Sequence, residues 1–311
     1  MQDLQDLLAE QGQWLPIDWP RAGDPGSIGG LVARGLAGGL RQRHLGVRDQ
    51  IIGIGLLRAD GVEAHAGGRV VKNVAGYDLM RLLCGSWGSL ALITELTLRV
   101  QPIRPAHATL VLHGDLSSQN GFRAELLRST LTPERCDWWD DGEGSWTLRL
   151  SVSSVSDQAV QDQLSRLASL ADDHGVAAER HSCSDLLETD MPCQDPCWLV
   201  RVVLPPAVLH QLLDSAAMAT LPQWQWDLAA GAGSGDGWSN EPGNGVQVEA
   251  LRRAVMALGG SVTLLQQPDG STIDAWLDTP ARPLIEAVKR QFDPRQQLCR
   301  GRLPGVNQAM T

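Results

Sequence analysis

Residues 72–98 read KNVAGYDLMRLLCGSWGSLALITELTL. Within this stretch, residues 78–84 predict a short helix whose first turn is capped by an acidic side chain. Residues 90–100 predict a strand, because they are rich in β-forming residues and are followed by the proline-containing QPIRP. Gly85 and Gly88 form a hinge between the two. A hydrophobic core alone does not require this order, whereas glycines let backbone N–H groups approach the oxygens of a ligand.

A second glycine-rich place lies upstream, in the stretch GDPGSIGGLVARGLAGG at residues 23–39. It is followed by HLGVRDQIIG and then by IIGIGLLRADGVEAHA at residues 51–66, which predicts two strands around a RADG turn. Residues 4–11 predict a helix from the spacing of their apolar residues. The two glycine-rich places have two interpretations: tight turns of an ordinary α+β fold, or backbone that lines a phosphate-bearing ligand.

Composition excludes several classes of function. The 311 residues carry a net charge of −10 without a long block of like charge, which argues against nucleic acid or anionic lipid as a partner. No apolar run is long enough to span a membrane, and the acidic N-terminal helix does not resemble a signal peptide. The sequence therefore predicts a cytoplasmic protein, either free or docked peripherally on a larger complex. The spacing of CSDLLETDMPCQDPC lacks the paired knuckles of metal sites, so we expect no metal and reduced thiols.

The pattern changes near residues 102–105, where strand-like runs begin to alternate with amphipathic helices. This alternation predicts an α+β second domain. Two of its runs, WTLRLSVSS and CWLVRVVLPP, form a weak repeat in which Arg149 and Arg201 alternate with core-facing residues. Their guanidinium groups suit carboxylates or phosphates, but arginines of this kind also cover apolar surface on exposed strands.

The order of these segments, GSIGG…GLAGG…HLGVRDQIIG…VVKNVAGYDLMRLLCGSWGSLALITELTLRVQPIRP, resembles the PCMH-type FAD-binding family, also called the vanillyl-alcohol-oxidase family. Within that family, VVKNVAGYDLMRLLCGSWG is most similar to the E-type FAD-binding subunits of glycolate oxidase, or glycolate dehydrogenase. The resemblance is strong over residues 20–105. It returns in FDPRQQLCRGRLPG, which is similar to the closing segment of the family.

The resemblance implies an α+β fold in three parts. Residues 1–105 would form a PCMH-type FAD-binding domain, residues 106–280 an α+β cap domain with an antiparallel sheet, and residues 281–311 a segment that returns to the FAD domain. The family has an earlier βα segment with its own glycine-rich pyrophosphate loop, which this sequence does not match. We therefore expect a partial FAD domain that lacks its first βα subdomain.

The resemblance also implies which residues bind the cofactor FAD. These are small or polar residues of the two glycine-rich places, the hinge, the following strand and the closing segment: Ser27, Gly29, Gly30, Gly35, Gly38, Asp49, Lys72, Asn73, Gly88, Ile93, Thr94, Glu95 and Arg302. Lys72 and Asn73 could equally fix a helix turn. Two departures from the family pattern are Ala91 in place of glycine and Cys299 in place of asparagine.

The resemblance implies a function within a complex. The chain would be the FAD-binding subunit of a glycolate oxidase, between a catalytic D-type flavoprotein subunit and an iron–sulfur F-type subunit. An FAD-free structural or assembly subunit of the same complex is one alternative. A stand-alone FAD-linked 2-hydroxy-acid dehydrogenase is the other, and it is less favoured because the sequence shows no catalytic base. No catalytic residue is assigned, and Arg149 and Arg201 are candidates to face the flavin or an anion.

Overall fold

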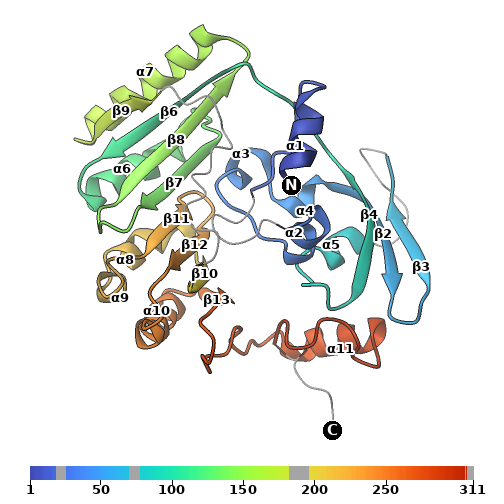
Figure 1. The fold of residues 1–311 in the computed structure, drawn as a ribbon. Helices are drawn as coiled ribbons and strands as arrows, with labels where there is room; N and C mark the ends of the chain where they lie inside the picture. The colour runs from blue at the N-terminus through green and yellow to red at the C-terminus, as the bar shows by residue number, and fades with distance from the viewer. Residues whose placement is uncertain (19–25, 70–77, 182–195, 305, 307–311) are drawn as a thin grey trace.

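The computed structural model describes residues 1–18, 26–69, 78–181, 196–304 and 306 of the chain. Its elements form two lobes, with the C-terminal helix returning to the first (Figure 1). The elements of the first lobe are α1 (Gln2–Ala9), β1 (Gln13–Trp14), α2 (Ile28–Arg34), α3 (Arg41–His44), α4 (Val47–Gln50), β2 (Ile51–Arg58), β3 (Glu63–Gly67), α5 (Leu79–Leu83), β4 (Ala91–Leu98) and β5 (Gln101–Pro102).

The first lobe is built on an antiparallel sheet in the order β3-β2-β4. The predicted strands around the RADG turn are β2 and β3, the predicted strand after the hinge is β4, and the predicted short helix is α5. Alternate residues such as Ile54 and Leu56 are buried against Leu31 of α2 and Leu83 of α5. This packing places the glycine-rich connections at the edge of the lobe that faces the second one.

The second lobe contains the larger sheet. Its elements are β6 (Ala106–His113), α6 (Leu116–Leu126), β7 (Arg135–Asp140), β8 (Thr147–Ser154), α7 (Asp157–Asp173), β9 (Ala177–His181), β10 (Trp198–Val203), η1 (Pro206–Val208), α8 (Leu209–Leu213), α9 (Ala216–Ala219), β11 (Gln225–Ala229), β12 (Ser234–Ser239), α10 (Gly245–Ala257) and β13 (Ser261–Gln266). The strand order is β13-β10-β12-β11-β7-β8-β6-β9, and every neighbouring pair is antiparallel.

One face of this sheet is apolar and the other is largely polar. Trp138, Leu148 and Trp226 point into a core that also contains Leu167 of α7 and Leu251 of α10. This core contains four indole side chains that are almost fully buried, those of Trp138, Trp198, Trp224 and Trp226. The residues that alternate with them, among them arginines and aspartates, lie on the opposite face, toward the first lobe. The expected α+β fold with an antiparallel cap sheet is confirmed.

Helix α11 (Arg282–Phe292) connects the two lobes at the C-terminal end. Its Val288 and Phe292 pack on the apolar core of the first lobe, although the chain reaches α11 from β13 of the second. The two large apolar cores among the described residues are separate, which fits the division that the sequence predicts. The bounds 105 and 280 stay a prediction.

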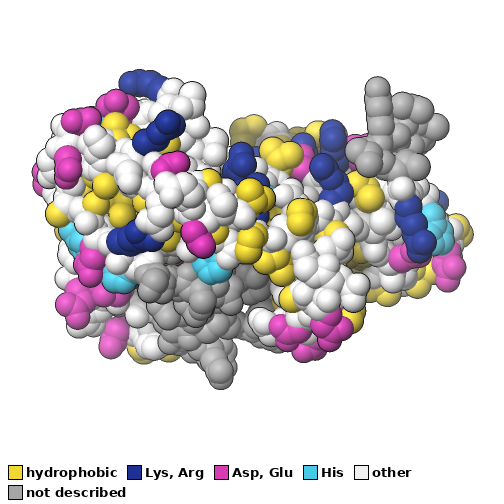
Figure 2. Space-filling view, turned by 90° about the horizontal axis from the view of Figure 1, so that it is seen from above, with side chains coloured by type: hydrophobic (Ala, Val, Ile, Leu, Met, Phe, Trp, Pro, Cys, Tyr) yellow, Lys and Arg dark blue, Asp and Glu magenta, His cyan; other side chains and the backbone are white. Residues whose placement is uncertain are grey.

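The described residues contain no helix that is long and apolar enough to cross a membrane. They also contain no group of three or more histidine, cysteine, aspartate or glutamate side chains placed to hold a metal ion. Of the cysteines, Cys183 and Cys193 lie outside the described residues, and the other four are free thiols. On the face seen from above, acidic and basic side chains are interspersed rather than gathered by sign (Figure 2).

Candidate functional site

The glycine-rich place at residues 23–39 includes the N-terminal end of α2. Ser27 has an extended backbone, and its Oγ accepts the N–H of Gly30 at 3.1 Å, which caps the helix. Gly29 is half-buried and Gly30 is exposed. A methyl group added to either would meet only Ser27 Oγ, at ordinary contact distance. The segment from Ser27 to Gly30 is therefore open enough for a ligand to reach its backbone.

Gly35 ends α2 in the left-handed conformation, with φ of 63°. A Cβ at this position would lie 2.7 Å from the backbone nitrogen of Gly85 in the hinge. The hinge in turn binds α2, since the N–H of Trp87 donates to the carbonyl of Ala33 at 2.8 Å. Gly35 is thus required for backbone-to-backbone packing between the two glycine-rich places. On the other side of the hinge, a Cβ on Gly88 would lie 3.0 Å from Cys299 Sγ of the closing segment.

We expect Gly35→Ala to lower the free energy of unfolding by about 2 kcal/mol, from left-handed strain plus overpacking on the hinge. Gly61→Ala is the matched control, because Gly61 also has a positive φ, 83°, but nothing lies near its missing Cβ. It should cost about 1 kcal/mol, from strain alone. Urea unfolding of both variants measures the difference. Equal losses would show that the contact with Gly85 does not constrain the protein.

The glycine segment, defined here as residues 36–40, is held by an aspartate that the sequence did not single out. Asp18 accepts the N–H of Gly38 at 2.9 Å and the N–H of Leu40 at 3.1 Å. A Cβ on Gly38 would lie 2.9 Å from Asp18 Cγ, and one on Gly39 would overlap the carboxylate of Asp137 in β7. The small residues of the glycine segment therefore make room for carboxylates of the protein itself.

The large sheet of the second lobe, called the cap sheet here, contacts the glycine segment from the other side. Arg201 of β10 forms a two-point ion pair with Asp236 of β12, with both N–O distances 2.8 Å. Its Nη1 donates to the carbonyl of Ala37 at 2.8 Å, and Ser234 Oγ donates to the same carbonyl at 3.3 Å. Arg201 therefore faces the glycine segment, with its charge matched by a carboxylate.

Arg135 of β7 links these two sets of contacts. It is 7% exposed and lies 2.7 Å from Asp137, 3.6 Å from Asp18 and 3.6 Å from Asp227 of β11. Burial alone would lower the pKa of Arg135, but the surrounding carboxylates outweigh it and raise that pKa. The guanidinium is therefore a fixed positive charge at the centre of the contact between the lobes.

A cavity of about 20 Å³ remains between the glycine segment and strands β7, β10, β11 and β12. A space of this size holds about one water molecule. Between the glycine segment and these four strands, the described residues therefore leave little more room than one water molecule needs.

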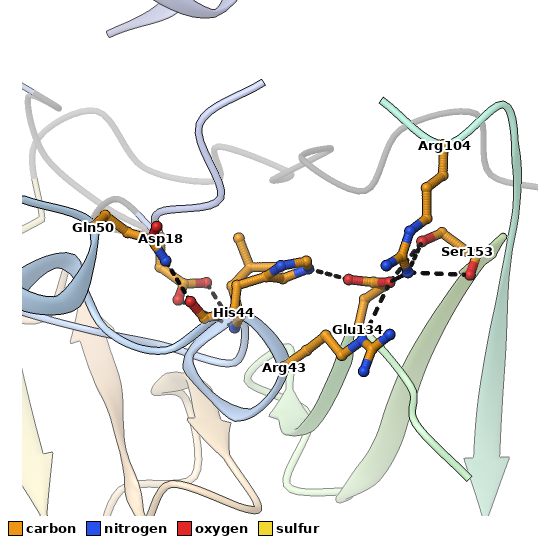
Figure 3. A network of polar contacts seen from close by, with 8 residues as sticks. Asp18, Arg43, His44, Gln50, Arg104, Glu134 and Ser153 are labelled. Atoms are coloured by element: carbon orange, nitrogen blue, oxygen red, sulfur yellow. Dashed lines mark hydrogen bonds and ion pairs between the residues drawn. The ribbon is translucent and has the colours of Figure 1, made fainter. Parts of the chain in front are cut away.

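A second polar cluster lies beside the first and joins the same lobes (Figure 3). Glu134, just before β7, is fully buried. Its carboxylate accepts hydrogen bonds from His44 of α3, from Arg104 in the connection between the lobes, and from Ser153 of β8, the last at 2.7 Å. The ring of His44 packs edge-on against Trp14 with the centroids 5.2 Å apart. This cluster fixes α3, which follows the glycine segment directly.

The other predicted residues are dispersed. Asp49 accepts the N–H of Gly46 at 3.2 Å and so closes the turn before α4. Thr94 is the extra residue of a bulge in β4, because Gly55 pairs with Glu95 and Leu56 pairs with Ile93.

Ile93 packs partly on the core, and Thr94 and Glu95 are exposed. Arg302 is exposed as well. Lys72 and Asn73 lie outside the described residues.

Arg149 of β8 lies on the same face of the cap sheet as Arg201, as its alternation predicts. Its Cζ is 4.1 Å from the centroid of Trp139, which is a cation–π contact. The two arginines thus differ: Arg201 contacts the glycine segment, whereas Arg149 stacks on the cap's own tryptophan. Their role toward a flavin or an anion stays a prediction.

Comparisons with known proteins identify the family of this chain. The family described as FAD binding domain matches residues 1–67. Glycolate oxidase subunit GlcE of Escherichia coli is 30% identical over 292 residues, which cover 94% of this chain and 75% of that protein. The chain belongs to the GlcE family. This match, together with the FAD binding domain, confirms the resemblance inferred from the sequence.

More distant relatives match shorter stretches of the chain. Glycolate oxidase subunit GlcD of Bacillus subtilis is 31% identical over 44% of this chain and 29% of its own length. The mitochondrial D-lactate dehydrogenase [cytochrome] of Arabidopsis thaliana is 38% identical over 35% of this chain and 19% of its own length. These matches place the GlcE-family chain among FAD-linked hydroxy-acid oxidoreductases.

A solved structure of alkyldihydroxyacetonephosphate synthase shows the same fold. It superposes with a TM-score of 0.65 at 14% identity, covering 94% of this chain and 61% of that one. At this identity the likeness concerns the fold alone.

The fit of FAD to these residues differs between the two parts of the glycine-rich region. The backbone from Ser27 to Gly30 leaves room for a phosphate group to approach closely, although the N–H of Gly30 already donates to Ser27 Oγ. The glycine segment does not fit a flavin ring in this conformation, since the N–H groups of Gly38 and Leu40 are bound to Asp18. The adjoining cavity of about 20 Å³ is also far too small for a three-ring system.

Proposed function

We propose that this chain is the FAD-binding E-type subunit of a glycolate-oxidising complex. The similarity to GlcE over 94% of the chain is the observation that carries the proposal. The complex would oxidise glycolate to glyoxylate, with a D-type flavoprotein subunit as the catalytic partner and an iron–sulfur F-type subunit as the next electron carrier. FAD would supply the electron acceptor when bound. Ser27 and Gly29 would offer backbone N–H groups to the phosphates of FAD, Gly30 would leave room for their close approach, and Arg302 would approach from the closing segment.

The proposal is tested by reconstitution. The chain is co-expressed with candidate D-type and F-type subunits, and glycolate-dependent dye reduction is compared with and without it. D-lactate and D-2-hydroxyglutarate serve as competing substrates. We expect activity to depend on the chain and to favour glycolate. Equal glycolate-dependent activity with the chain omitted would refute the proposal.

The second candidate function is an FAD-free assembly subunit of the same complex. It is favoured by the closed glycine segment, whose N–H groups bind Asp18 rather than remaining available to a ligand. In that case the purified chain is colourless, and the other subunits fail to associate without it. Stoichiometric flavin absorbance in the purified chain would exclude this function and support the first.

A further inference from the structure

The C-terminal part of the chain has a charge opposite to that of the rest. Residues 282–302 carry six basic and two acidic side chains, whereas the whole chain carries 26 basic and 36 acidic ones. This short segment therefore has a net charge of +4, and the remaining residues have a net charge of −14. A charge asymmetry of this size gives the segment a surface that attracts negatively charged groups.

Both acidic side chains of this segment have a basic partner within it. Lys289 Nζ lies 2.6 Å from Asp293 Oδ2, and Arg282 Nε lies 2.8 Å from Glu286 Oε1. Four exposed arginines remain, and no carboxylate of the described residues lies within ion-pair distance of any of them: Arg290, Arg295, Arg300 and Arg302. Because Arg302 belongs to the proposed FAD site, the basic patch is defined here as the other three.

The backbone that carries the basic patch is held in one conformation. Lys289 Nζ donates to the carbonyl of Leu298 at 2.9 Å, and Asp293 accepts the N–H of Leu298 at 2.8 Å. Arg300 Nε donates to the carbonyl of Gln296 at 2.6 Å. The turn after α11 is thus closed onto the end of the helix. A partner would meet guanidinium groups on an ordered backbone, which lowers the entropic cost of binding.

An acidic surface of another protein fits the basic patch better than nucleic acid or a membrane does. The planar fork of arginine binds a carboxylate at two points, and arginine is enriched at protein interfaces. A DNA duplex or an anionic bilayer extends far beyond three side chains and would be repelled by the remaining acidic surface. The apolar face of α11 cannot enter a bilayer, because Val288 and Phe292 pack on the core of the first lobe.

We propose that the basic patch docks this chain onto an acidic face of a partner protein, which in the proposed complex is another of its subunits. The inference rests on the proposed function and adds which surface of the chain the complex uses. Charged groups at the rim of an interface steer the encounter of two proteins, so the patch should act mainly on the rate of association.

The rate of association of the purified chain with the candidate D-type and F-type subunits tests this proposal. The patch variant Arg290→Gln/Arg295→Gln/Arg300→Gln removes three charges and keeps most of each side chain. We expect its association rate constant with one of the subunits to be roughly 10-fold lower at about 0.1 M salt. The difference should nearly vanish at about 1 M salt, where charges are screened within about 3 Å.

The matched control is Arg128→Gln/Arg166→Gln/Arg253→Gln, which removes the same charge from three separate exposed positions of the second lobe. Its association rate should stay close to that of the unmodified protein. Equal rates for the unmodified protein and the patch variant, or equal losses in the two triple variants, would overturn the basic patch as the docking surface. The complex would still form in either case, so the proposed function would stand.

The other classes of partner are separate arms of the same experiment. The probes are vesicles of phosphatidylcholine with phosphatidylserine and a short DNA duplex. Binding to either probe that depends on the basic patch, without patch-dependent binding to a subunit, would overturn an acidic protein as the partner. If the unmodified chain binds neither subunit, the proposed function and this inference fail together.

Discussion

Replacing Lys289 by methionine is expected to lower the free energy of unfolding by about 3–5 kcal/mol, the usual cost of breaking a buried ion pair from one side. Lys289 of α11 is 2% exposed. Its three ammonium hydrogens are matched by Asp293 Oδ2 at 2.6 Å, the carbonyl of Ser89 at 2.7 Å and the carbonyl of Leu298 at 2.9 Å. Methionine fills a similar volume but leaves the fully buried carboxylate of Asp293 without its cation.

Urea unfolding followed by tryptophan fluorescence measures this loss. The control on the same helix is Arg282→Met, whose ion pair with Glu286 is solvent-exposed and should contribute little to the free energy of unfolding. The double variant Lys289→Met/Asp293→Asn should lose less than Lys289→Met alone, because the unpaired charge is gone. A loss of about 1 kcal/mol or less in Lys289→Met would show that the ammonium group does not fasten the closing segment to the hinge.

The parts of the fold that the sequence predicts are those with local signals. The RADG turn between alternating residues predicts β2 and β3, and the acidic cap predicts α5 from Asp78. In the cap, alternation correctly separates Arg149 and Arg201 from the core-facing residues. Each of these features depends on neighbours within a few residues, so spacing alone is sufficient.

The contacts that close the site are not local. Asp18 reaches Gly38 over 20 residues, and Glu134 reaches His44 over 90 residues. The sequence signals these contacts only through the charged residues of the strand RCDWWD. A strand that contains two tryptophans rarely carries Arg135 and Asp137 unless these charges have buried partners.

The glycines illustrate a second limit. Glycine permits close approach, but the same signature arises whether a cofactor or the protein's own side chain approaches. Gly38 was predicted from the resemblance to bind FAD, and the structure places the carboxylate of Asp18 against it. Ser27 and Gly30, by contrast, remain open. The resemblance identifies glycines at which close approach is needed. Only the three-dimensional structure shows whether a protein side chain or open space lies against each of them.

The second large effect is expected at Glu134, the fully buried centre of the cluster in Figure 3. Glu134→Gln keeps the shape but removes the charge that pairs with His44 and Arg104. It should lower the free energy of unfolding at pH 7 by about 3 kcal/mol, the lower end for a buried pair because Arg104 is partly exposed. Glu179→Gln is the control, since Glu179 also pairs with histidines but is exposed, and it should cost at most about 1 kcal/mol.

The dependence on pH separates the charge from the shape of this side chain. Burial alone would raise the pKa of Glu134, but hydrogen bonds from His44 and Ser153 and the charges of His44 and Arg104 lower it overall, below its usual 4.5. A lowered pKa in the folded state means that the stabilisation is complete above the unfolded pKa and is lost as the pH falls through the folded one. The difference in unfolding free energy between the unmodified protein and Glu134→Gln should therefore be full at pH 7 and shrink below about pH 4.5. Urea unfolding at both ends of this range measures it, and a difference that stays constant with pH would mean that the carboxylate does not join the two lobes through its charge.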